Sequence, residues 1–284
     1  MKITNRISNK ILVLYIYIID QIFIYRLNNP IVGKRNLFNY ALSKASSLKS
    51  ISMKKINGYI AQKVIKEYSI RNSLHYQPSG RGYTGLGVLN QKMLEMEYQK
   101  LTSRLEFIVK NYSRALNIQV NQSWVEFGCG KGQNLKYLIS RDSNLTYHGF
   151  DINEDCLKVA NFGKISNGIT LQVGDIKDIE FLRRFNDNQF DNSLISHVLS
   201  TILCENIDAT EIIHKSIVSE LCRITKNSII IIDEQNIDNK FSVNIEQLNR
   251  ATINQDLFKF FKNYDGELFY IKTDESKALI FRKK

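Results

Sequence analysis

The second half of the chain alternates short apolar segments with amphipathic ones. The apolar segments have the length and side chains of buried strands, and the amphipathic segments repeat their apolar residues with the period of a helix. Strands and helices in alternation predict a parallel sheet with helices on both faces. The predicted strands are 124–127, 145–150, 169–173, 190–196 and 228–232, and the predicted helices are 133–139, 155–162 and 209–224.

The chain ends on two further predicted strands, 266–272 and 278–282. The segment 273–277 between them is too short for a parallel crossover, so one of the two must run antiparallel. The expected fold class is therefore α/β, a doubly wound and mostly parallel sheet.

The first half of the chain has a different pattern. An apolar run at 11–25 follows basic residues but is shorter than the roughly 20 residues of a membrane span, and it contains Asp20. Three interpretations remain open: a segment packed on the protein, one lying in a membrane interface, or a span. Two amphipathic helices are expected within 36–72, and a long helix over 88–116.

Glycines interrupt the pattern between 77 and 87, so no regular element is expected there. This loop is either a linker or an active-site lid that would bring Tyr83 to a substrate. We therefore divide the chain into a basic helical region, 1–87, and an α/β domain, 88–284.

The positive charge is unevenly distributed. The net charge is +11, yet residues 1–120 hold 19 Lys or Arg against 5 Asp or Glu, and the remainder holds 20 against 23. An excess of this kind indicates either an anionic partner, such as a membrane surface or an anionic acceptor, or simply a solvated basic face. The predicted location is cytoplasmic, with peripheral contact between residues 1–35 and a membrane as one possibility.

Three alternate glycines, Gly128, Gly130 and Gly132, follow the first strand of the α/β pattern and precede a helix. A sharp strand-to-helix turn needs positive φ, and a ligand lying on the backbone leaves no room for Cβ. Ligands of doubly wound sheets bind beyond the carboxyl ends of the strands, where Asp151 and His197 also fall. The turn is a candidate nucleotide cradle, with the Asp151 carboxylate placed to accept from ribose hydroxyls.

Other cofactor motifs fit less well. The dinucleotide fingerprint Gly-x-Gly-x-x-Gly would need a third glycine at Gln133, one residue later than Gly132. The phosphate-binding Gly-x-x-x-x-Gly-Lys-Ser/Thr pattern is absent. The four cysteines lack metal-ligand spacing and are expected to be buried thiols, so no metal site is predicted.

Taken together, these motifs resemble the class I S-adenosylmethionine-dependent methyltransferases. The resemblance rests on the run from Glu126 to Gly132, on Asp151 after its strand, on Gly174-Asp175, and on Ser196-His197 after Phe190-Asp191. It implies a seven-stranded sheet in the order 3-2-1-4-5-7-6, with the last strand antiparallel, and S-adenosylmethionine as cofactor. By resemblance, the site residues are Glu126 and the three glycines for the methionine moiety, Asp151 and Ile152 for the ribose, Asp175 and Ile176 for the adenine, and Ser196 near the methyl group.

Methyl transfer needs an aligned nucleophile and, for a hydroxyl acceptor, removal of a proton. His197 is the predicted base, with a packing histidine at this strand end as the alternative, and Tyr83 is a second candidate catalytic residue. No proline follows Pro78, which excludes the Asp/Asn-Pro-Pro-aromatic run of amino methylation of bases, so nucleic acid is not the expected acceptor. A small molecule or a glycan is expected, and a catalytically idle nucleotide-binding or membrane-associated scaffold of the same fold is the alternative.

Overall fold

The computed structural model describes residues 51–52, 65–66, 69–70, 104–160, 168–233, 242–247, 250–254, 256–272 and 277–284. Helix is present at 65–66 and 69–70, within the second helical pattern predicted for 36–72. The apolar run 11–25 and the glycine-rich loop 77–87 lie outside the described residues. The boundary drawn at residue 87 does too, and stays a prediction.

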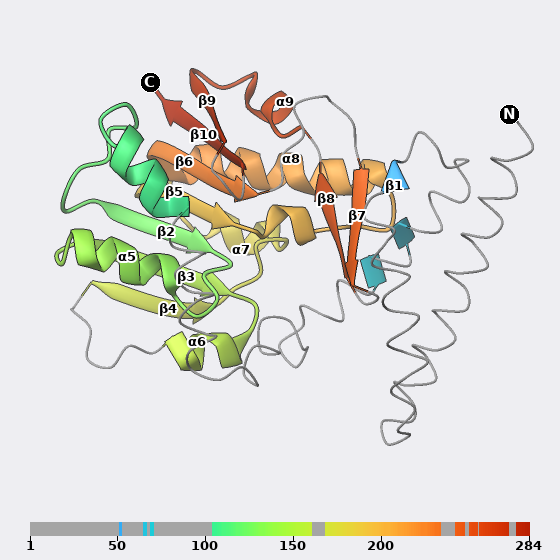
Figure 1. The fold of residues 1–284 in the computed structure, drawn as a ribbon, viewed down its shortest axis with the longest axis horizontal. Helices are drawn as coiled ribbons and strands as arrows, with labels where there is room; N and C mark the ends of the chain where they lie inside the picture. Colours follow the sequence, from blue (N-terminus) through green and yellow to red (C-terminus); the bar gives the residue numbers. More distant parts are fainter. Residues whose placement is uncertain are drawn as a thin grey trace, which may run out of the picture.

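A seven-stranded sheet forms the centre of the molecule, in the spatial order β4-β3-β2-β5-β6-β10-β9 (Figure 1). Strands β2 to β6 pair in parallel, whereas β10 runs antiparallel to both β6 and β9. The predicted order 3-2-1-4-5-7-6 with an antiparallel last strand is therefore confirmed. The strands are β2 Ser123–Phe127, β3 Thr146–Asp151, β4 Ile169–Val173, β5 Phe190–Ser196, β6 Thr225–Asp233, β9 Gly266–Lys272 and β10 Lys277–Lys283.

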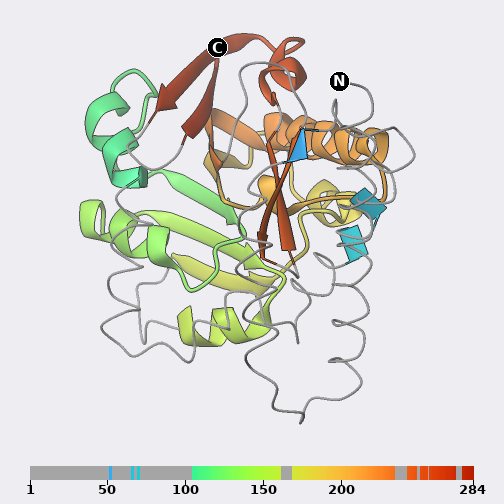
Figure 2. The same ribbon diagram turned by 45° about the vertical axis from the view of Figure 1, so that its right-hand side comes forward.

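Helices cover both faces of this sheet (Figures 1 and 2). One apolar core contains residues of α7, α8 and α9, and a second contains residues of α5, α6 and the helix 104–112. The labelled helices are α5 Gln133–Arg141, α6 Glu154–Ala160, α7 Ile179–Arg183, α8 Ile207–Ile224 and α9 Phe258–Phe261.

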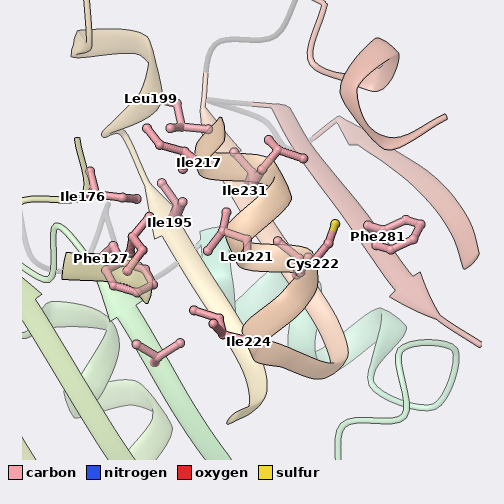
Figure 3. Close-up of a cluster of buried hydrophobic side chains, with 14 of the residues drawn as sticks. Phe127, Ile176, Ile195, Leu199, Ile217, Leu221, Cys222, Ile224, Ile231 and Phe281 are labelled. Carbon is pink, nitrogen blue, oxygen red and sulfur yellow. The ribbon is translucent and has the colours of Figure 1, made fainter. Parts of the chain in front are cut away.

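Successive side chains along a strand contribute alternately to the two apolar cores. In β6, Ile229 and Ile231 belong to the core under α8, and Ile230 and Ile232 belong to the opposite one. Successive side chains of a strand point to opposite faces, so a continuous apolar run fills two layers at once. Each of these isoleucines is fully buried, which is worth roughly 1.5 to 3 kcal/mol per side chain. Figure 3 shows the core on the α8 face.

Side-chain caps fix where several helices begin. Asn206 accepts from the backbone N–H of Ala209 and starts α8 at residue 207, two residues before the predicted start. Asn153 accepts from two backbone N–H groups at the start of α6. The helix predicted over 88–116 ends at residue 112 in the described part, because Asn117 takes a left-handed conformation with φ 54° and the chain turns.

A second, three-stranded sheet has the order β1-β7-β8 and was not predicted. Its strands are β1 Ile51–Ser52, β7 Ser242–Gln247 and β8 Arg250–Asn254, and all neighbours run antiparallel. Strand β8 lies against the 3₁₀ turn η3, Leu199–Thr201, which follows β5. The hairpin of β7 and β8 is therefore placed at the carboxyl end of the parallel strands (Figure 1).

No helix within the described part of the chain combines the length and the apolar character needed to cross a bilayer.

Candidate functional site: the carboxyl ends of β2 to β5

The glycine turn connects β2 to α5 and has the predicted backbone geometry. Gly128, Gly130 and Gly132 have φ values of 76°, 53° and 71°, in the left-handed region that favours glycine. The backbone N–H groups of Gly128 and Cys129 both donate to the carbonyl of Phe150, at 2.7 and 3.0 Å. The turn is thus attached to the end of β3, and Gly132 begins α5 without a side-chain cap.

Two of these glycines face different surroundings. A Cβ on Gly128 would lie 2.1 Å from Cγ2 of Val198, the second residue after β5. A Cβ on Gly130 would meet nothing closer than Oε1 of Gln133, at 3.6 Å. Gly128 is therefore required by close packing within the protein, whereas Gly130 leaves space above the turn.

Asp151 ends β3 and binds this turn. One carboxylate oxygen accepts from the backbone N–H of Gly130 and the other from that of Asn153, each at 2.8 Å. Burial raises the pKa of the carboxyl, and the two backbone hydrogen bonds oppose that rise. Each oxygen keeps further acceptor capacity. The helix that follows is capped by Asn153, and Asp151 is held by its contact with the glycine turn.

Glu126 lies beneath the turn and is 1% exposed. Nδ2 of Asn134 donates to its Oε1 at 2.7 Å, and the hydroxyl of Tyr147 donates to its Oε2. Burial raises the pKa of Glu126 to about 7, although both hydrogen bonds favour the ionised form. The carboxylate is thus hydrogen bonded to side chains of α5 and β3. A direct contact with the methionine moiety stays a prediction.

The remaining predicted cofactor residues lie at neighbouring strand ends. Asp175 follows β4, and its Oδ1 accepts from the backbone N–H of Lys177 at 2.9 Å. Ile176 is 6% exposed and belongs to the core on the α8 face. Ile152 and Ser196, at the ends of β3 and β5, are both partly exposed.

His197 follows β5 in a left-handed conformation with φ 56°. Its backbone N–H donates to the carbonyl of Ile232 at 2.8 Å, which holds it against β6. The side chain of Arg104, on the helix 104–112, is hydrogen bonded through Nη1 to Nε2 of the imidazole. Burial, and secondarily the charge of Arg104, lower the pKa of His197 to about 4. A histidine in this state is a weak base.

The structure thus gathers most of the predicted site at one edge of the sheet. The glycine turn, Asp151, Asp175 and His197 all follow the carboxyl ends of adjacent strands. Tyr83 lies outside the described residues. Which of these side chains bind ligand stays a prediction.

Sequence reasoning missed three residues that contact the predicted ones: Asn134, Tyr147 and Arg104. Tyr147 lies on the same face of β3 as Gly149, which pairs with Glu126, so its contact could be placed only once the register of β2 with β3 was known. Asn134 lies two residues after the last glycine of the turn, close enough in the sequence for the turn motif to indicate it. Arg104 precedes His197 by 93 positions, and no local pattern joins them.

The family model described as "Methyltransferase domain" matches residues 118–273 of this chain. The chain belongs to the methyltransferase domain family. The predicted resemblance is confirmed at this level, and with it the methyltransferase class of enzyme. The matched range begins just before β2 and includes the glycine turn, both aspartates and His197.

No curated protein matches the chain significantly. Solved structures with a similar arrangement include the PH0226 protein from Pyrococcus horikoshii OT3, at 15% identity, covering 69% of this chain and 93% of that chain, with a TM-score of 0.47. A SAM-dependent methyltransferase from Aquifex aeolicus has 14% identity, coverage of 66% and 96%, and a TM-score of 0.44. The 1,6-didemethyltoxoflavin-N1-methyltransferase of Burkholderia thailandensis, with bound S-adenosylhomocysteine, has 9% identity, coverage of 68% and 88%, and a TM-score of 0.44.

Proposed function

We propose that this methyltransferase binds S-adenosylmethionine across the carboxyl ends of β2, β3 and β4 and transfers its methyl group to a small-molecule or glycan acceptor near the end of β5. The observation that carries the proposal is the glycine turn held to Asp151, where the N–H of Gly130 meets the carboxylate at 2.8 Å. Bound S-adenosylmethionine supplies an electrophilic methyl group on a sulfonium sulfur.

The residues present suit this cofactor. Asp151 has acceptor capacity left for ribose hydroxyls after its two backbone bonds. The first turn of α5 has N–H groups without a side-chain cap, which favours a carboxylate such as that of methionine. Oδ1 of Asn134 is buried and has no hydrogen-bond donor among the described residues, so it is suited to an ammonium group.

The adenine is assigned to Asp175 and Ile176, and Ile152 to the ribose. Ile176 is an apolar residue buried just beyond β4, and the backbone N–H of Gly174 fixes this turn to the carbonyl of Asp151 at 3.1 Å. The turn after β4 and the end of β3 are therefore held together. Ser196 and His197, one strand further, would border the methyl group.

The acceptor is assigned by its chemistry. After β5 the chain continues as His197, Val198 and η3, with no proline, so the run used for amino methylation of nucleic acid bases is missing. Arg104 places a positive charge beside the imidazole of His197 at this strand end, which favours an acceptor with an electronegative or anionic group.

The location of the enzyme is proposed from sequence alone: cytoplasmic, with residues 1–35 in peripheral contact with an anionic membrane. Pelleting with anionic liposomes, with and without residues 1–35, tests the contact. Equal binding by both proteins would refute it.

Calorimetric titration of the full chain with S-adenosylmethionine, and separately with NAD, tests the cofactor assignment. We expect binding of the former only, with a Kd in the micromolar range, equivalent to about −8 kcal/mol. Asp151→Ala should weaken it by about 1.5 kcal/mol or more, because hydrogen bonds to a carboxylate are lost. Asp155→Ala removes a carboxylate that is 64% exposed and pairs with Lys158 on the same helix, and it should leave affinity unchanged.

Two outcomes would count against the proposal. No binding of S-adenosylmethionine, after any co-purified ligand has been removed, would refute the cofactor assignment. Binding without formation of S-adenosylhomocysteine, across acceptors that carry carboxylate, phenol, amine and sugar hydroxyl groups, would favour the idle scaffold.

A further inference from the structure

Two basic side chains meet at the end of β5, where the methyl acceptor is proposed to bind. Arg104 comes from the helix 104–112 and His197 from the strand end, and Nη1 of the first is hydrogen bonded to Nε2 of the second. The contact is partly buried. Its chemistry determines which imidazole nitrogen carries the proton.

A guanidinium group has five N–H donors and no acceptor. Nε2 of His197 must therefore accept the hydrogen bond, and the proton of a neutral imidazole must be on Nδ1. Protonating Nε2 would set two donors and two positive charges against each other. The lowered pKa of His197, due to burial and then to Arg104, agrees with a neutral ring.

The backbone of His197 is held in place as well. A non-glycine residue with φ 56° is in an unfavourable conformation, and such residues occur where the surrounding structure fixes them, often at functional sites. His197 is bound to β6 through its N–H, and Val198 beside it packs on Gly128 of the turn. Arg104 therefore holds the imidazole, and β6 and the glycine turn fix the backbone that carries it.

We propose that Arg104 is a positioning residue that holds His197 with its proton on Nδ1, so that His197 donates a hydrogen bond to the methyl acceptor and does not serve as its base. This inference rests on the proposed function of the site. It replaces the role of base that sequence reasoning gave to His197.

The acceptor class follows from this assignment. An Nδ1–H group recognises an oxygen or nitrogen that has a lone pair, and the nearby charge of Arg104 favours a group with negative charge, such as a carboxylate or a phenolate. Within the described part of the chain, no group accepts from Nδ1. An acceptor that is already ionised has no proton for His197 to remove.

Imidazole ¹⁵N NMR of the full chain, labelled at histidine, tests the tautomer without any acceptor. The spectrum separates Nδ1–H from Nε2–H, and the absence of one signal set in His197→Asn assigns it among the four histidines. We expect Nδ1–H in the wild type and no protonation of the ring above about pH 5. An Nε2–H ring, or one that titrates near its ordinary pKa, would overturn the proposal.

Variants at Arg104 separate positioning from a structural role. Arg104→Met should raise the pKa of His197 only part of the way to 6.5, because burial is the larger cause, and should release the ring to the Nε2–H tautomer. Arg104→Lys keeps a donor without an acceptor and should retain Nδ1–H. Arg114→Met, at an exposed arginine just beyond the same helix, is the control and should leave His197 unchanged.

An unchanged tautomer in Arg104→Met would also overturn the proposal. If that variant does not fold, the wild-type spectrum still decides. Failure of the cofactor assignment is seen separately, as loss of S-adenosylmethionine binding in the calorimetric test.

Discussion

Replacing Gly128 by alanine tests whether the glycine turn is shaped by its contact with β5. Two costs combine at this position. A Cβ at φ 76° is strained by roughly 1 to 2 kcal/mol. The same Cβ would lie 2.1 Å from Cγ2 of Val198, and overpacking of this kind typically costs about 1 to 3 kcal/mol. Gly128→Ala should therefore lower the free energy of unfolding by roughly 2 to 5 kcal/mol.

Gly130→Ala is the matched control. Its φ is 53°, and the nearest atom to a new Cβ is 3.6 Å away, so only the conformational cost of about 1 to 2 kcal/mol applies. Urea unfolding of both variants, and of each combined with Val198→Ala, gives the interaction free energy between each glycine position and Val198. We expect Val198→Ala to recover about 1 to 3 kcal/mol with Gly128→Ala and nothing with Gly130→Ala. Equal losses for the two glycine variants, without coupling to Val198, would refute the reasoning.

Three further variants test the buried polar groups. Burial raises the pKa of Glu126 from 4.5 to about 7. The protonated carboxyl therefore makes its full contribution to the free energy of unfolding below pH 4.5, and about 3 kcal/mol of that free energy is lost as the pH rises through 7. Urea unfolding at pH 5 and at pH 8 should show that Glu126→Gln no longer loses this stability at the higher pH. An unchanged pH dependence in the variant would contradict the assignment to Glu126. Tyr147→Phe removes a donor to the same carboxylate and should destabilise by about 1 to 3 kcal/mol at pH 8 but by less at pH 5. Ser228→Ala breaks a buried bond of 2.7 Å to the carbonyl of Leu116 and should lower the thermal midpoint, with a cost of about 1 to 3 kcal/mol, whereas Ser140→Ala at an exposed site should not.

The central sheet could be predicted because its signals are local. Strands β4 and β5 have the predicted bounds, 169–173 and 190–196, since each is an apolar run limited by turn residues. That one of the last two strands runs antiparallel followed from the short segment between β9 and β10, and the resemblance indicated that it is the last one. Their order in space came from the family resemblance, because strand length and periodicity do not determine which strands are neighbours.

The β7–β8 hairpin could not be predicted in the same way. Its first strand pairs with β1, and Ile51 and Val243 are partners far apart in the sequence. A short strand with a remote partner gives a weak periodic signal, because the pairing supplies much of what stabilises it.

The candidate site was predictable in its residues but not in their roles. Glycine spacing and the aspartates after strands indicated where a ligand could bind, since turn chemistry is local. The burial of Glu126 and the state of His197 depend on Tyr147 and Arg104, and those contacts require the register of β2 with β3 and the position of the helix 104–112. Sequence alone supplies neither.

The pairing of β1 with β7 has a consequence for the order in which the protein acquires structure. During synthesis Ser52 emerges 190 residues before its partner Ser242, whereas strands β2 to β6 are complete at Asp233. Contacts between distant residues form slowly because a long loop must close first, and chains gain structure as they emerge. We therefore expect the glycine turn and Asp151 to be in place while the sheet of β1, β7 and β8 is still open. Nascent chains would then pass through a stage in which the proposed cofactor site is formed before the hairpin side.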